Sequence, residues 1–516
     1  MHNVKLVLTI FVFAFLSQTS ACSHRRNFSK DLESPLGMNA HLLFDCSNMY
    51  IEELCMAMSN CGVQVVRLDV YWHKGNMLVQ NDLLEKAIYY IDKYGMETEL
   101  NMPQCAKDLN SKELQSWVKT IQYYAQKYDG HHLVSVGNTE KPRKIKIRYF
   151  EVMNELDRKF DSDNESVAKA FSLIKLSSNA IREIRPDGSA LLVMPGMSQI
   201  NDFNRKLLAY KDCENISIKD IVDIMSFHLY SSRTNDFVRS LMDWMSFFNT
   251  FEGLADKPVW LTEFGNSTWD YSIALQAENL PKQALLASAM GVDKFFYYQF
   301  HQAGGNELKT HHQREDYFGI IETSIQNSYG SFLCNDGIYD KAITPGDATK
   351  KVYIRMNDSI FALRTISKGM QEVIKKTGIA VGGNNYTIQK VSIEKKNKGN
   401  RVIYQGRFKI GTSGKDVMTI PPHCFGDLEV SDIIVVYVKD VKNQSEKWNC
   451  LQSLPAYESY SKLAKMIGVN PTRPTYTINN GQYNFVWMNE KKRVNASWME
   501  REGKRTLVRY KVKGTK

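Results

Sequence analysis

Two glutamates lie at the ends of strand-like runs, where a carboxylate could do chemistry. Glu155 ends "YFEVMNE" and Glu263 ends "VWLTE". Aromatic and β-branched residues favour a buried strand, so these polar ends need an explanation. One explanation is local: Asn154 and Glu155 cap the strand or start a turn. The other is chemical, because two carboxylates in different surroundings can serve as an acid and as an ionised partner.

The elements that must position these glutamates alternate between strand-like runs and amphipathic helical patterns. The predicted strands lie within residues 36–44, 63–70, 96–103, 147–155, 190–197, 221–230, 257–265 and 293–300. The predicted helices lie within residues 49–62, 81–95, 110–128, 166–184, 201–211, 234–251, 272–291 and, after a long loop, 347–376. In the helix at 81–95, apolar residues share one face and Gly95 marks the end.

Eight strand–helix units predict the α/β fold class and a (β/α)8 barrel over residues 35–376. A doubly wound open sheet is the alternative, but no Gly-rich dinucleotide fingerprint follows an early strand. After residue 377 the helical patterns stop, apart from a short one at 457–467, and strand-like runs follow one another. Residues 377–516 are therefore predicted to form an accessory antiparallel β domain, sandwich-like in character.

The first 22 residues have the features of an export signal. Lys5 precedes the apolar run "LVLTIFVFAFL", which is too short to span a bilayer. The following "SQTSAC" resembles a bacterial lipoprotein signal, in which Cys22 becomes the lipidated first residue, although Thr19 replaces the usual aliphatic residue. An ordinary secretory peptide of residues 1–21 is the alternative. We expect an exported protein, periplasmic or at the cell surface, that meets a membrane only through a lipid anchor on Cys22.

Composition excludes several functional classes. The chain has 43% hydrophobic residues, 24% charged residues and a formal charge of +10, without basic–aromatic signatures of nucleic-acid binding. Its nine cysteines show no scaffold spacing and no paired C-x-x-C metal signature. We therefore expect no cofactor and no metal. The densest basic run, "KPRKIKIR" at 141–148, is either a solvated loop and strand edge or a contact for an anionic substrate.

The barrel brings the two glutamates into one chemical hypothesis. Active sites of this fold lie at the C-terminal ends of the strands. Glu155 ends the fourth predicted strand and Glu263 the seventh, on opposite sides of an eight-stranded ring. Glycoside hydrolysis needs such a pair: an acid with a raised pKa that protonates the leaving oxygen, and an ionised carboxylate on the other face of the sugar.

Four motifs in the barrel segment resemble those of clan A retaining glycoside hydrolases, families 39 and 5 among them: "MNE", "LTEFG", "VVRLD" and "SFHLY". The resemblance implies that Glu155 is the acid/base and Glu263 the nucleophile. It further implies that Asn154 holds the 2-hydroxyl of the sugar and that Arg67 keeps Glu263 ionised. His228 and Tyr230 would support the nucleophile or bind sugar.

The chain departs from that pattern at two places. Leu156 follows Glu155 where many members have proline, and Tyr298, Gln299 and His301 end the eighth strand where tryptophan is common. Because family 39 includes β-xylosidases and α-L-iduronidases, the sugar stays open.

Other residues are weaker candidates. His41 either lines a sugar site or is satisfied locally, and Trp72 and Trp269 either stack on sugar or pack in the core. "HHQRE" at 311–315 lacks the i, i+4 spacing of helical metal ligands and is better explained as a solvated loop. Core packing is the better explanation for the late tryptophans Trp448, Trp487 and Trp498.

The sequence thus predicts a retaining glycosidase that acts outside the cytoplasm on a poly- or oligosaccharide, acidic glycans included. One alternative is a catalytically inactive carbohydrate-binding lipoprotein on a barrel scaffold, and another is a metal-dependent barrel hydrolase. The intact glutamate pair with Asn154 and Arg67 favours the glycosidase, because a binding protein needs neither an acid nor a nucleophile.

Overall fold

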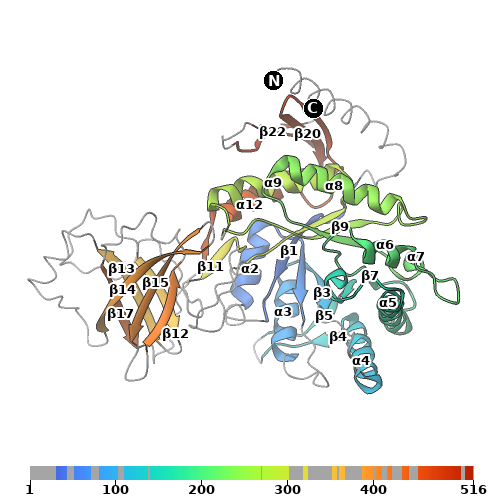
Figure 1. Ribbon diagram of the computed structural model, residues 1–516, viewed down its shortest axis with the longest axis horizontal. Coiled ribbons are helices and arrows are strands. Elements are labelled where there is room, and N and C mark those ends of the chain that lie inside the picture. Colours follow the sequence, from blue (N-terminus) through green and yellow to red (C-terminus); the bar gives the residue numbers. More distant parts are fainter. Residues whose placement is uncertain are drawn as a thin grey trace, which may run out of the picture.

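The structure is a computed structural model of the 516-residue chain (Figure 1). It describes residues 31–43, 51–70, 81–102, 110–137, 140–268, 270–301, 318–323, 351–356, 359–366, 386–398, 401–409, 415–420, 433–440, 451–500 and 506–514. The predicted signal segment with Cys22, and also Trp72, Trp269, Trp448 and "HHQRE", lie outside these residues. Among the described residues, no helix combines the length and apolarity needed to cross a membrane.

Eight parallel strands form the centre of the molecule, and their order in the sheet is β7-β6-β3-β2-β1-β10-β9-β8. The strands are β1 (Leu36–Ala40), β2 (Val65–Asp69), β3 (Glu97–Met102), β6 (Tyr149–Val152), β7 (Leu191–Val193), β8 (Met225–Leu229), β9 (Val259–Phe264) and β10 (Lys294–Tyr297). Parallel bridges from Val193 to Ile224 and from Met197 to Phe227 connect the β7 side to the β8 side. The sheet is therefore a nearly closed barrel, and the predicted (β/α)8 fold is confirmed.

Helices that follow the strands cover the barrel (Figure 1). They are α2 (Ile51–Cys61), α3 (Asn81–Lys93), α4 (Ser111–Lys127), α5 (Asn164–Ile184), α6 (Asp202–Ala209), the short α7 (Ile218–Ile221), α8 (Thr234–Asn249) and α9 (Ile273–Ala289). The capping box expected at Asn110 and Glu113 is present, because each side chain accepts a hydrogen bond from the other residue's backbone N–H. Such caps fix where a helix begins.

The eighth helix lies far from its predicted place. The prediction of a helix within 347–376 is wrong, because β12 (Lys351–Met356) and β13 (Ser359–Ile366) form an antiparallel pair there. The helix that packs beside α2 and α9 is α12 (Pro455–Ile467). Its buried Tyr460 donates a hydrogen bond of 3.0 Å to the carbonyl of Gly37 in β1. The barrel therefore extends past residue 376 and takes its last helix from the predicted accessory domain.

The remaining strands form separate antiparallel sheets. A six-stranded sheet has the order β12-β13-β17-β14-β15-β16, with β14 (Tyr386–Lys398), β15 (Arg401–Lys409), β16 (Lys415–Ile420) and β17 (Ile433–Asp440). A four-stranded sheet follows α12, with β19 (Thr475–Asn479), β20 (Gln482–Asn489), β21 (Lys492–Met499) and β22 (Arg509–Gly514). The β-rich character predicted after residue 377 is confirmed. The single domain predicted there is instead two sheets separated by α12.

A short strand pair marks where the six-stranded sheet enters and leaves the barrel segment. β11 (Ile321–Thr323) and β18 (Leu451–Ser453) are antiparallel, with Thr323 opposite Leu451. The six-stranded sheet is therefore an insertion between the last strand and the last helix of the barrel.

The barrel interior changes from apolar to polar along its axis. At the N-terminal ends of the strands, a buried cluster fills the interior: Val65, Tyr149, Val193, Ile224, Trp260 and Phe296. Two residues further along β2 and β6, the inward positions hold Arg67 and Glu151, because alternate strand residues share a face. The apolar layer thus supports a layer of buried charge, on which the site is built.

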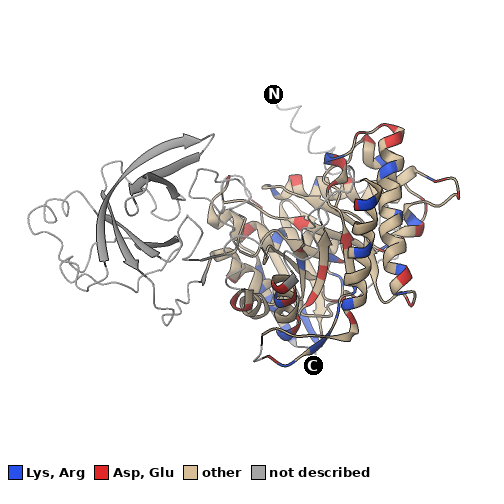
Figure 2. Cartoon of the chain, turned by 90° about the horizontal axis from the view of Figure 1, so that it is seen from below, with Lys and Arg blue, Asp and Glu red and all other residues tan. Residues whose placement is uncertain are grey.

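The basic run at 141–148 lies at the opposite end of the barrel from the site. It runs through β5 (Arg143–Lys146), paired with β4 (Asp129–Val134), into the N-terminal end of β6. Arg143 lies 2.6 Å from Asp92 and Arg148 lies 3.4 Å from Glu33. The interpretation of this run as a substrate contact is therefore wrong, and it is a solvated hairpin among the mixed surface charges of the barrel (Figure 2).

Candidate active site

A β-bulge turns Glu263 into the barrel. Phe227 of β8 is opposite Leu261, but the next residue, His228, is opposite Glu263, so β9 has one extra residue at Thr262. Trp260 packs in the interior cluster, and strict alternation would point Glu263 outward toward the helices. The extra residue reverses the orientation, as bulges near active sites often do. Glu263 is consequently 8% exposed at the C-terminal end of the barrel.

Glu155 is held by the unusual backbone that follows β6. Met153 has φ 74° and Glu155 has φ 48°, and both belong to the left-handed region that non-glycine residues rarely occupy. The Glu155 amide donates a hydrogen bond of 3.0 Å to the carbonyl of Gly196, in the loop after β7. Backbone strain of this kind persists where the surroundings enforce it, and it clusters at functional sites.

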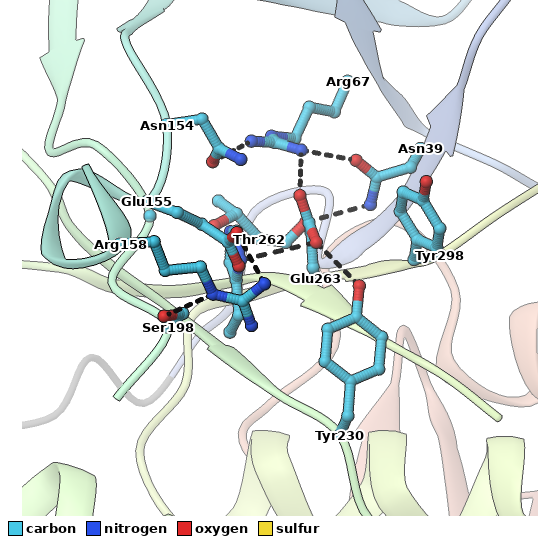
Figure 3. Close-up of polar contacts among 12 residues, drawn as sticks. Asn39, Arg67, Asn154, Glu155, Arg158, Ser198, Tyr230, Thr262, Glu263 and Tyr298 are labelled. Atoms are coloured by element: carbon cyan, nitrogen blue, oxygen red, sulfur yellow. Dashed lines mark hydrogen bonds and ion pairs between the residues drawn. The ribbon is translucent and has the colours of Figure 1, made fainter. Parts of the chain in front are cut away.

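His228 lies between the two glutamates. Its Nδ1 lies 3.0 Å from Oε1 of Glu155 and 3.4 Å from Oε2 of Glu263. One carboxyl oxygen of each glutamate and a nitrogen of His228 all lie within 4.8 Å of one another. Gly196 makes room for the imidazole, because a Cβ on Gly196 would lie 2.1 Å from Nε2 of His228. The structure therefore brings an oxygen of each carboxylate close together, and Figure 3 shows Glu155 and Glu263 near each other.

Arg67 holds the polar layer together from β2. Its guanidinium donates to Glu151 at 2.6 Å, to Asn39 at 2.8 Å, to Glu263 at 2.9 Å and to Asn154 at 3.0 Å. Asn39 in turn donates to the carbonyl of Thr262, the extra residue in β9. This network fixes Oε1 of Glu263 and places a permanent positive charge beside it, as Figure 3 shows.

The second oxygen of Glu263 is held by Tyr230. The phenol of Tyr230 donates a hydrogen bond of 2.6 Å to Oε2 of Glu263. The ring of Tyr230 contacts Tyr298 and Phe318 edge to face, with centroids 6.3 Å and 5.5 Å away. Both oxygens of Glu263 are therefore fixed by donors, and its carboxylate cannot rotate freely.

A second ion pair lies beside this group. Nδ1 of His41 is 3.0 Å from Asp69, and its Nε2 is 3.2 Å from the hydroxyl of Tyr298. Burial lowers the pKa of His41, but the charge of Asp69 and its hydrogen bond outweigh that effect, so the pKa is raised overall. His41 is thus satisfied locally, and it also connects to Tyr298 at the edge of the site.

Arg158 reaches Glu155 from the other side. Its guanidinium lies 3.3 Å from Oε2 of Glu155, and its Nε donates at 3.0 Å to the hydroxyl of Ser198. Ser198 donates in turn to Asp157 at 2.7 Å. These residues border a cleft of about 380 Å³ that opens beside Glu155 and is lined by Glu155, Arg158, Ser198, Ile200, His228, Leu229, Tyr230, Ser240, Asp243 and Trp244.

The protonation states follow from these contacts. Burial raises the pKa of Glu155, but the hydrogen bond and charge of His228, together with Arg158 and Arg67, outweigh burial and lower it overall. Burial lowers the pKa of His228, but the charges of Glu263 and Glu155 raise it overall. In the free site, these contacts therefore favour the ionised form of Glu155 and the positively charged form of His228. The expectation that the acid has a raised pKa is not met in this state, because two cations face Glu155.

Below the site, Glu151 is completely buried and bonded to Arg67 and to the amide of Gly196. Its neighbour Glu99 is also buried, and burial together with the Glu151 charge raises the pKa of Glu99 well above its usual range. These surroundings favour the uncharged form of Glu99, and Arg67 contacts Glu151 and Glu263 instead.

The arrangement suits acid–base and nucleophilic chemistry better than metal binding. Glu155, His228 and Glu263 are close enough to ligate one ion. A ligating histidine must be neutral, whereas both carboxylates favour the charged form of His228. The same three groups supply a carboxyl group held by two donors, a second carboxyl group and an imidazole between them.

The six residues predicted to form the site, namely Glu155, Glu263, Asn154, Arg67, His228 and Tyr230, lie together in the structure (Figure 3). The sequence analysis did not identify Asn39, Glu151 or Arg158. A polar residue inside an otherwise apolar strand was the available signal for Asn39 and Glu151. No comparable pattern marks Arg158, which follows the strand in the short helix η2 (Leu156–Arg158).

Comparison with known proteins adds one sequence match. Residues 129–313 match the family model described as glycosyl hydrolase catalytic core, a segment that contains both glutamates. No curated protein matches the chain.

Solved structures resemble the chain only distantly. A family 39 glycoside hydrolase from the gut symbiont Bacteroides cellulosilyticus WH2 has 13% identity and a TM-score of 0.43, over 79% of this chain and 81% of that one. A glucosidase from Croceicoccus marinus has 12% identity and a TM-score of 0.43, over 80% and 98%. An endo-1,4-beta-mannanase from Rhizomucor miehei has 15% identity and a TM-score of 0.39, over 56% and 90%.

Proposed function

We propose that the protein is a retaining glycoside hydrolase that cleaves O-glycosidic bonds of a poly- or oligosaccharide by double displacement. The observation that carries the proposal is the approach of the Glu155 and Glu263 carboxyl oxygens within 4.8 Å at the C-terminal end of a barrel. Retaining glycosidases hold their two carboxyl groups about 5 to 5.5 Å apart, whereas inverting enzymes leave room for a water at about 6.5 to 9.5 Å. The match of residues 129–313 to a glycosyl hydrolase core also supports it.

Glu263 is the proposed nucleophile. Its two oxygens accept hydrogen bonds from Arg67 and Tyr230, which fix the direction of the carboxylate. Attack on the anomeric carbon forms a covalent glycosyl-enzyme as the bond to the leaving oxygen breaks. Asn154 accepts from Arg67 through Oδ1, which leaves its amide nitrogen to donate to a hydroxyl of the same sugar.

Glu155 is the proposed acid and base. It must carry a proton when the leaving oxygen departs, although the free site favours its ionised form. Protonated His228 lies 3.0 Å away and holds that proton. Transfer of one proton along this hydrogen bond gives the acid form of Glu155 without a proton from solvent. After the leaving group has gone, Glu155 accepts a proton from the attacking water.

Replacement of each glutamate tests these roles with aryl glycosides that span a range of leaving-group pKa values. Glu263→Ala should be nearly inactive on every substrate, because no intermediate can form. Glu155→Ala should keep the first step for good leaving groups, and added azide should speed turnover by replacing the activated water.

Proton NMR of the first product should show the anomeric configuration of the substrate. An inverted product would show that water attacks directly and that Glu263 is not the nucleophile. If no glycoside of a broad panel reacts while the folded protein binds glycans, the chain is the inactive carbohydrate-binding alternative.

We also propose export and anchoring through Cys22, which rests on "SQTSAC" after a short apolar run. Cys22→Ala should move the protein from the membrane fraction to the soluble exported fraction. Cys213→Ala is the control, because it removes an exposed thiol far along the chain. A wild-type protein found only in the soluble fraction would exclude the anchor.

A further inference from the structure

The four-stranded C-terminal sheet presents one basic face, which we define by Arg493, Arg509, Lys511 and Lys513. Residues directly opposite one another in a sheet share a face. Arg493 of β21 is opposite Lys513 of β22, and Lys511 and Arg509 are opposite Asn495 and Ser497 on the same side. All four cations are exposed, and Figure 2 shows blue stretches of the ribbon beside the C-terminus.

The other face of the sheet is occupied by the barrel. Tyr483 donates a hydrogen bond of 2.9 Å to Asn235 of α8, and the indole of Trp487 donates at 3.0 Å to the carbonyl of Met466 in α12. Trp498 is buried and stacks on Tyr483 with centroids 4.9 Å apart. Packing therefore explains the predicted tryptophans Trp487 and Trp498, but it does not explain the cations on the outer side.

The cations of the basic face have no acidic partner in the part of the chain that the structure describes. None of the four forms an ion pair with a residue that the structure describes, and two of them, Arg493 and Lys513, are directly opposite each other. Like charges in that position destabilise a sheet. The described acids nearest in the chain are Glu490, in the turn before β21, and Glu500, which is bonded to Lys282. The arrangement costs stability unless an anion from outside neutralises it.

The spacing suits a chain of anions better than one ion. Alternate residues of a strand lie about 6.8 Å apart, so Arg509, Lys511 and Lys513 form a row about 14 Å long. Neutral donors and acceptors lie beside the row, namely Asn484, Asn495, Ser497, Thr475 and Thr477. No aromatic residue belongs to this face of the described strands, which disfavours stacked nucleic-acid bases.

We propose that the basic face binds a linear anionic polysaccharide, whose charged groups pair with the row of cations and whose hydroxyls bond to the neighbouring amides and hydroxyls. The inference rests on the proposed function, because it takes the bound polymer to be of the same class as the substrate. The sheet then holds the enzyme on the polymer and leaves the chemistry to the barrel.

Retardation in native gels that contain polygalacturonate tests the proposal, with fully methyl-esterified polygalacturonate as the neutral probe. Chondroitin sulfate serves as a second, sulfated polyanion. The variant R509Q/K511Q/K513Q should lose at least about tenfold in affinity for both polyanions and show a weaker salt dependence. The variant K112Q/K119Q/K169Q removes three exposed lysines from α4 and α5 and should bind like the wild type. R509K/K511R/K513R, which keeps the charges, should also bind.

Several outcomes would overturn the proposal. The esterified polymer could retard the protein as strongly as polygalacturonate, or R509Q/K511Q/K513Q could bind as well as the wild type. K112Q/K119Q/K169Q could lose as much affinity as the glutamine variant of the basic face. The protein could also bind anionic lipid vesicles but neither polyanion. Hydrolysis of a small aryl glycoside is measured in parallel and should be the same for all variants. Absence of hydrolysis in the wild type would count against the proposed function, whereas loss of polymer binding alone would not.

Discussion

His228 connects the two carboxylates of the site, so its proton affects stability as well as chemistry. Its pKa is raised in the folded protein. A histidine of this kind contributes stability that is fully present below its unfolded pKa, about 6.5, and that is lost as pH rises through the folded pKa. Glu155 has a lowered pKa, so its contribution to stability depends on pH in the opposite sense. This contribution is present above the unfolded pKa of Glu155, about 4.3, and is lost as pH falls.

We therefore expect the free energy of unfolding in urea to decline as pH rises above about 6.5, and His228→Gln to decline less over the same range. His41→Gln is the matched comparison. The pKa of His41 is also raised, so this variant loses a second contribution to stability with the same dependence on pH. A wild type and a His228→Gln variant with parallel pH curves would show that His228 does not carry this proton.

Arg158 should lower the pKa of Glu155, the proposed acid. It is one of the cations that lower the pKa of Glu155, so Arg158→Gln should raise that pKa. Because the acid must be protonated in the first step, the basic limb of the kcat/KM profile should move to higher pH, by up to about one unit. Arg158→Lys keeps the charge and should move the limb less. A limb that stays in place in Arg158→Gln would show that Glu155 does not set it.

Among single residues, the site residues at the ends of strands could be predicted from the sequence. Glu155, Glu263 and His228 are visible because each lies at or near the end of a predicted strand, and the fold brings strand ends together. Arg67 lies inside β2 and was found through the resemblance of its motif "VVRLD". Arg158 is different, because it contacts Glu155, three residues before it, only through the short helix η2 and the left-handed backbone of Glu155, and its Nε is held by Ser198. Such contacts depend on loop conformation, which periodicity does not encode.

At the scale of elements, β9 shows where pattern and structure diverge. Its position in the chain was predictable, but the bulge at Thr262 was not, and strict alternation would have turned Glu263 away from the site. The strands at 351–366 show the opposite error: a helix was predicted there, but β12 pairs with β13, and β13 pairs with β17 (433–440). Long-range pairing overrides local preference in such segments.

The loop after β7 gives a test at this scale. Gly196→Ala should displace His228, because the new Cβ would lie 2.1 Å from Nε2. A displacement of about 1 Å in such a site costs about 100-fold in kcat.

Gly95→Ala is the control for Gly196→Ala. The new Cβ at residue 95 would meet nothing within 4 Å, but the φ of 77° is strained for alanine. It should lower stability by about 1 kcal/mol and leave kcat unchanged. Equal kcat in Gly196→Ala and the wild type would show that the position of His228 is not critical.

For the whole molecule, the insertion predicts which segment can be removed. Thr323 and Leu451 are opposite each other in the β11–β18 pair, so a two-residue Asn-Gly turn can replace residues 324–450. The shortened protein should fold and hydrolyse small aryl glycosides.

Truncation at residue 376 should instead unfold the barrel, because it removes α12 and its hydrogen bond from Tyr460 to β1. Circular dichroism and thermal unfolding of both variants check this. A stable, active truncation would show that α12 is dispensable.

The late position of α12 also has a consequence for how the chain reaches its native state. β1 must pair with β10, and the helix that packs over β1, α12, begins only at Pro455. Contacts between such distant segments have a high loop-closure cost and slow folding. During synthesis the first strands therefore emerge long before their last cover exists, with apolar surface exposed. Substitutions on the buried face of α12 should act first on the folding yield in the cell, through aggregation and proteolysis, and only secondarily on the reaction.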